Sequence, residues 1–304
     1  MFTIDVVEED KYNELLIKNG DVYTPLTQAP KYSFNNIYLL IKTNNKEIGI
    51  LSISLRTKFK GIFKYARINN GPIIFKKNIN KNYLIKSIFN YLKKRGYRLI
   101  LFAPHPEIKP RDIKKIKFLF KLPLNKSGTI LLNLNKPIEE LRSCLKQKWR
   151  NTLNKSLKFT KVKKLTDSQD ITEILSKYQE FANKNKFTPI DINRCKKWAI
   201  EKNDLINLKI YQAFELNSEF LGSIGIISFA KTSFYLFGFS NKKGRKIHAN
   251  SALLWQAIKD SKDNKNEIFD LGGLNESTPL GIRKFKEGLG GERISNIGEF
   301  LKII

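Results

Sequence analysis

The feature of this sequence that most constrains its fold is an internal repeat. Residues 47–49 (Glu-Ile-Gly) align with residues 220–222 (Phe-Leu-Gly) at an offset of 173. Residues 99–101 align with residues 268–270 at an offset of 169. Similar segments at a nearly constant offset indicate a tandem duplication. We therefore expect two similar domains.

Both halves show the same succession of apolar runs and amphipathic segments. Apolar runs between turn residues predict strands, and apolar residues at three- and four-residue spacing predict helices. In the first half, strands are expected at 2–7, 37–42, 47–55, 65–75 and 97–102, and helices at 8–19 and 82–95. In the second half, strands are expected at 161–165, 208–216, 220–229, 233–239 and 268–271, and helices at 170–184, 191–201 and 249–261. A meander followed by a strand–helix–strand unit predicts an α/β (mixed α+β) fold, in which each domain is a mixed sheet flanked by helices.

The length of 304 residues fits two domains with sizeable cores. We place the boundary near residues 135–137. Residues 1–137 then form a basic N-terminal domain, and residues 138–304 form a C-terminal domain that contains the active site. A helix over residues 138–159 is expected to bridge the two.

The charge is concentrated in one part of the chain. Lys and Arg number 56 and Asp and Glu 28, a net charge of +28. Residues 51–164 hold 30 basic and 4 acidic residues, whereas residues 251–304 hold 8 of each. Such asymmetry favours a polyanionic partner on one side of the protein. The alternative is a lysine-rich composition from an AT-rich genome, which would not spare the C-terminal block.

The stretch over residues 267–291 is where we place the site. A short apolar run ends in Asp270 and the pair Gly272-Gly273, then come the basic segment 283–286 and a second glycine cluster. A carboxylate, backbone amides and cations within one stretch could activate a nucleophile and stabilise an oxyanion. The alternative is a polar turn that leads into a solvated helix.

Other classes of protein are disfavoured by what the sequence lacks. No apolar run reaches the roughly 18 residues of a membrane span, and the first residues carry early acids rather than a basic signal-peptide region. Two cysteines and two histidines are too few for a disulfide framework or a zinc site, so we expect no metal. These features favour a cytoplasmic protein with reduced thiols.

The motifs of the second half resemble those of a known family. The segment FDLGG followed by GIRKFKEGLGGE closely resembles the C-terminal signature of the Fem family of peptidoglycan bridge-forming aminoacyltransferases. TILLNLNKPIEELRSCLKQKWRNTLNKSLK resembles the central motif of the family, and ANSALLWQAIKDSKD is a weaker match. The resemblance implies two Gcn5-related N-acyltransferase-like domains in tandem.

The resemblance also implies an activity and its partners. The expected reaction moves an amino acid from aminoacyl-tRNA to an amine on the stem peptide of a peptidoglycan precursor, forming a peptide bond. Aminoacyl-tRNA is then a co-substrate and no further cofactor is needed. The precursor would be nucleotide- or lipid-linked, which would allow peripheral contact at the inner membrane face. The basic region 51–164 would receive the polyanionic tRNA.

Residue roles follow from the same resemblance. Lys286 matches the lysine of the FK-x-G motif and is expected to stabilise the transition state, and Asp270, the substrate or solvent would take the proton of the amine. Expected substrate-binding residues are Arg194, Trp198, Tyr235, Gly272, Gly273, Arg283, Lys284 and Phe285. Expected tRNA-binding residues are Lys146, Lys148, Arg150, Lys155 and Arg245.

Two alternative functions stay open at this point. One is an N-acyltransferase that uses acyl-CoA, although the expected pyrophosphate loop at 241–249 offers one glycine among several basic residues. The other is an RNA-binding module on the same fold without catalysis.

Overall fold

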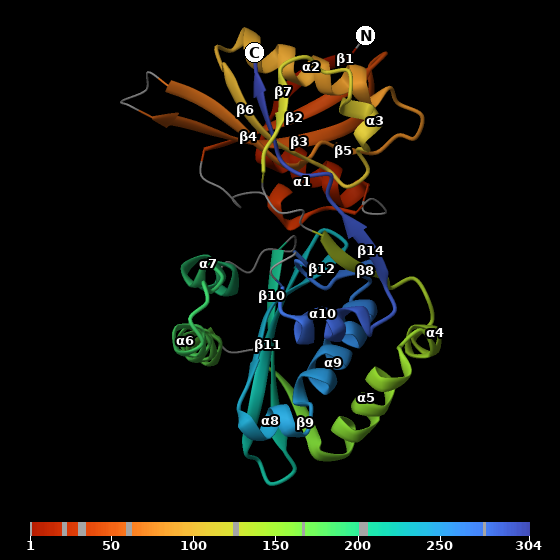
Figure 1. The fold of residues 1–304 in the computed structure, drawn as a ribbon, viewed down its shortest axis with the longest axis vertical. Coiled ribbons are helices and arrows are strands. Elements are labelled where there is room, and N and C mark those ends of the chain that lie inside the picture. The colour runs from red at the N-terminus through yellow and green to blue at the C-terminus, as the bar shows by residue number, and fades with distance from the viewer. Residues whose placement is uncertain are drawn as a thin grey trace. The chain divides into compact units, whose positions relative to one another are not determined.

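The protein forms two compact units, each built on one mixed sheet (Figure 1). The first unit comprises residues 1–128, 275–277 and 294–304, and the second comprises residues 129–274 and 278–293. The computed structural model describes residues 2–19, 23–29, 35–58, 63–123, 128–165, 168–200, 206–275 and 278–304.

The division into units differs from the predicted boundary at residue 137. Residues 129–137 belong to the second unit, and the C-terminal residues 294–304 belong to the first. The reason is strand pairing between segments that are far apart in the sequence, as the two sheets show.

The sheet of the first unit has eight strands in the order β1-β2-β3-β4-β6-β15-β7, with β5 paired to β3. The strands are β1 (Phe2–Val7), β2 (Asn36–Thr43), β3 (Lys46–Lys58), β4 (Phe63–Gly71), β5 (Ile73–Ile74), β6 (Leu99–Pro104), β7 (Leu119–Lys121) and β15 (Phe300–Ile303). Strands β1 to β4 form an antiparallel meander and β6 lies parallel to β4. Strand β15 pairs antiparallel with both β6 and β7.

The helical segments of this unit are α1 (Glu9–Lys18), η1 (Leu26–Gln28), α2 (Lys81–Lys94) and α3 (Pro110–Ile113). Helix α2 begins after Asn80, whose side chain accepts a hydrogen bond from the Tyr83 amide at 3.0 Å. Its apolar stripe, which includes Leu84, Ile88 and Leu92, is buried in the core of the unit.

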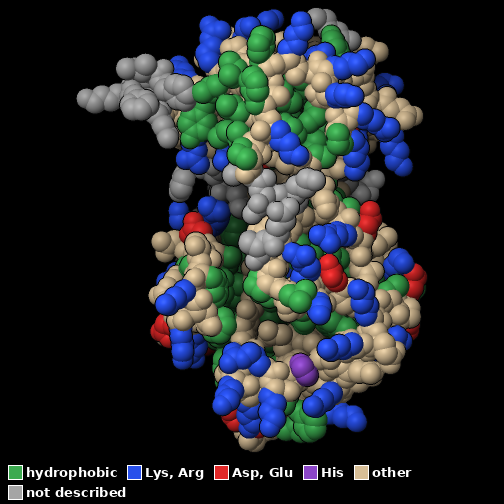
Figure 2. All heavy atoms as spheres, in the orientation of Figure 1, with side chains coloured by type: hydrophobic (Ala, Val, Ile, Leu, Met, Phe, Trp, Pro, Cys, Tyr) green, Lys and Arg blue, Asp and Glu red, His purple; other side chains and the backbone are tan. Residues whose placement is uncertain are grey.

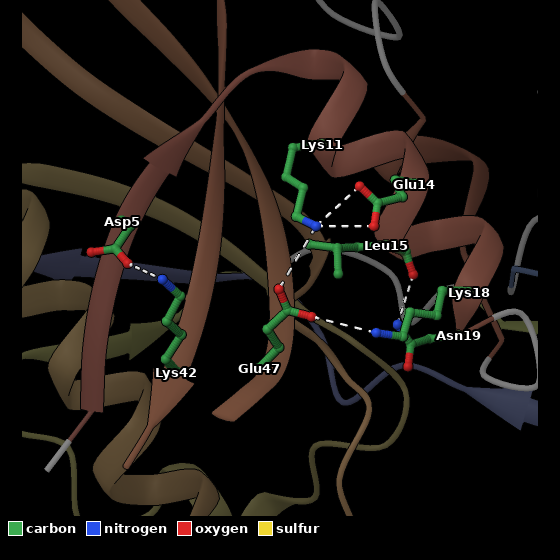
Figure 3. A network of polar contacts seen from close by, with 8 residues as sticks. All are labelled: Asp5, Lys11, Glu14, Leu15, Lys18, Asn19, Lys42 and Glu47. Atoms are coloured by element: carbon green, nitrogen blue, oxygen red, sulfur yellow. Dashed lines mark hydrogen bonds and ion pairs between the residues drawn. The ribbon is translucent and has the colours of Figure 1, made fainter. Parts of the chain in front are cut away.

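Acidic residues of the first unit are paired with lysines around α1 and the first strands (Figure 3). Lys42 lies 2.8 Å from Asp5, and Lys11 lies 3.0 Å from Glu14 and 3.9 Å from Glu47. These pairs are exposed, so each contributes little to stability. They do, however, neutralise lysines at this part of the unit.

The sheet of the second unit has seven strands in the order β14-β8-β13-β12-β11-β10-β9. The strands are β8 (Gly128–Asn133), β9 (Thr160–Leu165), β10 (Ile206–Glu215), β11 (Phe220–Phe229), β12 (Thr232–Ser240), β13 (Ile268–Asp270) and β14 (Glu292–Ser295). The helices are α4 (Ile138–Ser143), α5 (Gln147–Phe159), α6 (Ser168–Lys184), α7 (Ile192–Ile200), α8 (Lys242–Lys246), α9 (Ala249–Asp263) and α10 (Leu280–Glu287). Helices α5 and α9 lie on one side of strands β10 to β12, and α6 and α7 lie on the other (Figure 1).

The two sheets repeat one topology, which confirms the predicted duplication. The order β1-β2-β3-β4-β6 corresponds to β9-β10-β11-β12-β13, and both series end in a parallel pair. The aligned glycines Gly49 and Gly222 occupy equivalent places, since a Cβ on either would come within 2.6 Å and 2.5 Å of a backbone oxygen on another strand. Next to the parallel pair, β15 occupies in the first sheet the position of β8 in the second.

The predicted single helix over residues 138–159 is wrong, because α4 ends at Ser143 and α5 begins at Gln147. Lys146 between them is extended, and its amide donates to the Gly288 carbonyl at 2.9 Å. Gly290 packs so closely that a Cβ there would lie 2.1 Å from the Cys144 carbonyl oxygen. Both helices lie in the second unit.

Candidate active site

Lys286 is the one buried side chain of α10, with 7% of its surface exposed. Its ammonium donates a hydrogen bond to the Gly273 carbonyl oxygen at 2.9 Å and lies 5.9 Å from the centroid of the Tyr235 ring. Burial lowers the pKa of Lys286 to about 8, although the nearby Asp270 carboxylate opposes this shift. The result is a buried cation that gives up its proton more easily than an ordinary lysine.

The turn after β13 brings backbone and side chains close to this ammonium. Gly272 has a φ of +74°, which favours glycine, and a Cβ there would lie 2.8 Å from the Tyr235 carbonyl oxygen and 3.6 Å from the Lys286 Nζ. Gly273 is exposed and has nothing within 4 Å of an added Cβ. Gly272 therefore allows the close approach, whereas Gly273 supplies the carbonyl that binds Lys286.

Asp270 is buried at the end of β13 and participates in holding this turn. Its Oδ1 accepts a hydrogen bond from the Gly272 amide at 2.8 Å and another from the hydroxyl of Thr129. The Thr129 hydroxyl also lies 3.0 Å from the Gly272 carbonyl oxygen. Thr129 was not predicted from the sequence, because its proximity depends on the pairing of β8 with β13.

An aromatic pair supports α10 from one side. The ring centroids of Phe285 and Trp149 lie 5.9 Å apart, and a Cβ on Gly288 would lie 2.6 Å from the Trp149 ring. Trp149 is a further residue that sequence reasoning missed. Elsewhere on α10, Leu280 and Ile282 are 62% and 48% exposed. This helix thus fixes Lys286 and leaves an apolar surface open.

The other predicted side chains near Lys286 are less buried than Lys286 itself. Arg283 is half-buried and Lys284 is exposed. Tyr235 is partly buried, and its surroundings raise the pKa of its hydroxyl through desolvation. The predicted set of Lys286, Asp270, Tyr235 and the two turn glycines is therefore brought together within the second unit.

The predicted pair Arg194 and Trp198 lies elsewhere, on α7. The Arg194 guanidinium lies 5.9 Å from the Trp198 ring centroid and 3.3 Å from the Asp191 carboxylate, and Trp198 is buried. Asp191 also accepts a hydrogen bond from the Arg194 amide at 3.0 Å, as expected for a residue that caps the helix. Because α7 lies apart from α10 (Figure 1), this pair does not join the cluster around Lys286.

Basic residues gather where α5 meets the start of α9. Lys148 and Lys155 of α5 are exposed. His248, the residue before α9, has a lowered pKa, mainly because of burial and in addition because of the positive charges of Lys155 and Lys148. None of these three residues has a recorded ion pair within the described parts of the chain. Figure 2 shows Lys and Arg side chains over α5 and α8.

The other residues predicted to bind tRNA lie on or beside the same helices. Lys146 is exposed at the start of α5, and Arg150 donates to the Leu145 carbonyl at 3.4 Å. Arg245 of α8 is exposed and donates to the Ser240 carbonyl at 2.7 Å. We call the group Lys146, Lys148, Lys155, Arg245 and His248 the basic patch.

The described residues contain no group of three or more His, Cys, Asp or Glu side chains that could hold a metal ion. In the same part of the chain, no helix is long and apolar enough to cross a membrane.

Comparisons with known proteins agree with this fold. The FemAB family model matches residues 132–304. The chain is similar to the crystal structure of FemX, with 13% identity, a TM-score of 0.77 and coverage of 99% of this chain and 97% of that one. It is also similar to a tandem GNAT protein from the clavulanic acid biosynthesis pathway, with 8% identity, a TM-score of 0.52 and coverage of 100% and 98%. L-PGS from Bacillus licheniformis gives 12% identity, a TM-score of 0.56 and coverage of 98% and 92%. No curated protein matches the chain.

The fold is therefore that of two Gcn5-related N-acyltransferase-like domains in tandem. The family model covers more than half of the chain, so the chain belongs to the FemAB family of peptidoglycan bridge-forming transferases. The resemblance described from the sequence motifs is confirmed.

Proposed function

We propose that this protein moves an amino acid from aminoacyl-tRNA to an amine on the stem peptide of a peptidoglycan precursor. The observation that carries the proposal is the buried ammonium of Lys286 at the Gly272-Gly273 turn. Membership of the FemAB family supports a precursor as the acceptor. The precursor would be nucleotide- or lipid-linked, and the protein would act in the cytoplasm, at the membrane face when the acceptor is lipid-linked.

The proposed chemistry begins when the acceptor amine attacks the ester carbonyl of the aminoacyl-tRNA. A tetrahedral intermediate forms, its carbon–oxygen bond to the ribose breaks, the ribose oxygen gains a proton and the amine nitrogen loses one. The Lys286 ammonium would stabilise the oxyanion, an effect worth about 3–4 kcal/mol for one donor in a site shielded from water. A pKa of about 8 keeps Lys286 mostly protonated near neutral pH.

Asp270 is assigned a positioning role in this mechanism. Its Oδ1 is engaged by the Gly272 amide, and its charge favours the protonated form of Lys286. The proton of the acceptor amine would then leave to the substrate or to solvent rather than to Asp270.

The basic patch supports a tRNA donor. A tRNA carries closely spaced phosphates, and exposed Lys and Arg side chains on α5 and α8 would contact them without reading bases. In an acyl-CoA enzyme, backbone amides at a glycine-rich loop would hold the pyrophosphate. Here the Gly244 amide is already bonded to the Asn241 side chain at 2.7 Å, and a Cβ on Gly244 would lie 2.2 Å from the Leu221 carbonyl oxygen.

The test is a comparison of donors. The protein is incubated with peptidoglycan precursor and either charged tRNA or acetyl-CoA, and peptide products are measured by mass spectrometry. Transfer from charged tRNA alone supports the proposal. Transfer from acetyl-CoA alone contradicts it. Salt-sensitive tRNA binding without any transfer would also contradict it and would favour a non-catalytic RNA-binding module.

The Lys148→Ala, Lys155→Ala double variant tests the basic patch within the same assay. We expect weaker tRNA binding and a shallower salt dependence, by about 0.7–0.9 in slope for each lost phosphate contact. The matched control is Lys177→Ala, because Lys177 on α6 is exposed and already paired with Glu173 at 2.6 Å.

A further inference from the structure

A second concentration of lysines lines a cavity in the first unit, and none of them belongs to the candidate active site or to the basic patch. The cavity measures about 510 Å³ and lies between α2, the segment before β7 and the end of β15. Five lysines line it, together with Phe118 and no Asp or Glu: Lys86, Lys93, Lys115, Lys117 and Lys302. Lys86 and Lys93 are two turns apart on α2 and so share a face.

Lys302 is the residue that makes this a built site rather than a charged surface. It is 7% exposed, its ammonium donates to the Ile303 carbonyl, and it lies 5.7 Å from the Phe118 ring centroid. Burial and then the charge of Lys93 lower its pKa. A buried ammonium beside other cations and without a carboxylate partner is unfavourable, and a bound anion would relieve the cost.

The lack of acidic partners distinguishes the cavity lysines from the lysines around α1. Around α1, lysines of the same unit are paired with Asp5, Glu14 and Glu47 (Figure 3). For the five cavity lysines, the described parts of the chain record no ion pair. The charge of the cavity is therefore available to a ligand.

The shape and the aromatic residue narrow the chemistry of that ligand. A cavity of this size fits a small molecule, within the range of about 300–1,000 Å³ common for ligand pockets. Phe118 is 66% exposed and offers a ring face on which a flat base can stack. Lysines bind phosphate as point charges. Figure 2 shows hydrophobic side chains beside Lys and Arg side chains over the visible face of this unit.

We propose that this cavity binds a nucleoside polyphosphate, with its phosphates on the lysines around Lys302 and its base on Phe118. The chemistry is that of a nucleotide with at least two phosphates. Its source would be a free nucleotide or the nucleotide end of a larger metabolite. The site lies in the first unit, and the proposal does not depend on the transfer reaction.

The test uses the full-length protein and measures thermal stability with added ligand, because a ligand that binds the folded state raises Tm. UDP, ATP and inorganic pyrophosphate are compared at low salt, with a short RNA oligonucleotide and vesicles of anionic lipid as separate arms. We expect each small phosphate ligand to raise Tm by about 3 °C or more. UDP or ATP should also bind in calorimetry.

Variants separate the parts of the proposed site. Lys302→Gln should weaken UDP binding at least tenfold. Lys94→Ala, on α2 but outside the cavity lining, should match the wild type. Phe118→Ala should weaken UDP binding and leave pyrophosphate binding unchanged. Circular dichroism checks that each variant is folded. If Lys302→Gln does not fold, the double variant Lys86→Ala, Lys93→Ala replaces it in the same binding test.

Three results would overturn the proposal. They are no response to UDP, ATP or pyrophosphate in the wild type, an unchanged response in a folded Lys302→Gln variant, or a response confined to the RNA or vesicle arm. Since binding is read without any transfer assay, failure here leaves the proposed enzymatic function untouched.

Discussion

The Lys286 ammonium binds the Gly273 carbonyl oxygen at 2.9 Å, which fixes a buried cation against the glycine turn that follows β13. Two segments that require glycine flank this contact, namely the turn after β13 and the chain after α10. The turn needs Gly272 in a left-handed conformation, and the chain after α10 needs Gly288 and Gly290 to pack on Trp149 and Cys144. The glycines of the motif therefore allow the close packing that positions the lysine.

The first prediction concerns the pH dependence of transfer. Burial lowers the pKa of Lys286 to about 8, and the proposed mechanism needs the protonated form. Single-turnover rates divided by those of Lys286→Arg at the same pH should therefore fall as pH rises through about 8, because the pH-dependent supply of neutral acceptor amine is common to both enzymes. Lys286→Arg should be slower but lack this basic limb, since a guanidinium stays protonated throughout. A ratio that stays constant up to about pH 9.5 would argue against an ammonium role.

The second prediction concerns Asp270→Asn. The amide oxygen of Asn can still accept from the Gly272 amide, so we expect a loss of less than tenfold at pH 6.5. Because the Asp270 charge raises the pKa of Lys286, its removal should shift the basic limb to lower pH. A general base would behave differently, with a loss of about 10²–10⁴. Such a loss in a folded variant would restore Asp270 as the base.

The third prediction compares the two glycines of the turn. Gly272→Ala places a Cβ 2.8 Å from the Tyr235 carbonyl oxygen at a φ of +74°, and we expect destabilisation by about 1–3 kcal/mol and slower transfer. Gly273→Ala is the matched control, because nothing lies within 4 Å of its Cβ. Denaturant unfolding and single-turnover rates provide the two measurements. Equal behaviour of the two variants would contradict the proposed role of the turn.

Much of the fold follows from local sequence signals. The hairpin of β2 and β3 and the helix α2 were predicted within a few residues, because alternation, turn residues and helical spacing are local. The repeat was visible because Gly49 and Gly222 are both held in close contact with a neighbouring strand. Local patterns and the alignment of the two halves thus predicted that each unit is a mixed sheet flanked by helices.

Long-range pairing could not be predicted in this way. Strand β15 joins β6 across nearly two hundred residues, and nothing in the residues 300–303 says which sheet they enter. The break between α4 and α5 depends on Gly288 and Gly290, which are distant in the sequence. At the site, Lys286 came from the motif resemblance, whereas Thr129 and Trp149 depend on how strands and helices pack.

The measurement that tests the central claim most directly is the single-turnover rate of amide formation from charged tRNA by Lys286→Met, with tRNA affinity measured alongside. Met keeps most of the side-chain volume and removes only the ammonium. We predict a rate at least about 10² lower with tRNA affinity little changed, and wild-type behaviour for the control Lys177→Ala, an exposed lysine on α6. A folded Lys286→Met variant that forms product at the wild-type rate would contradict the account.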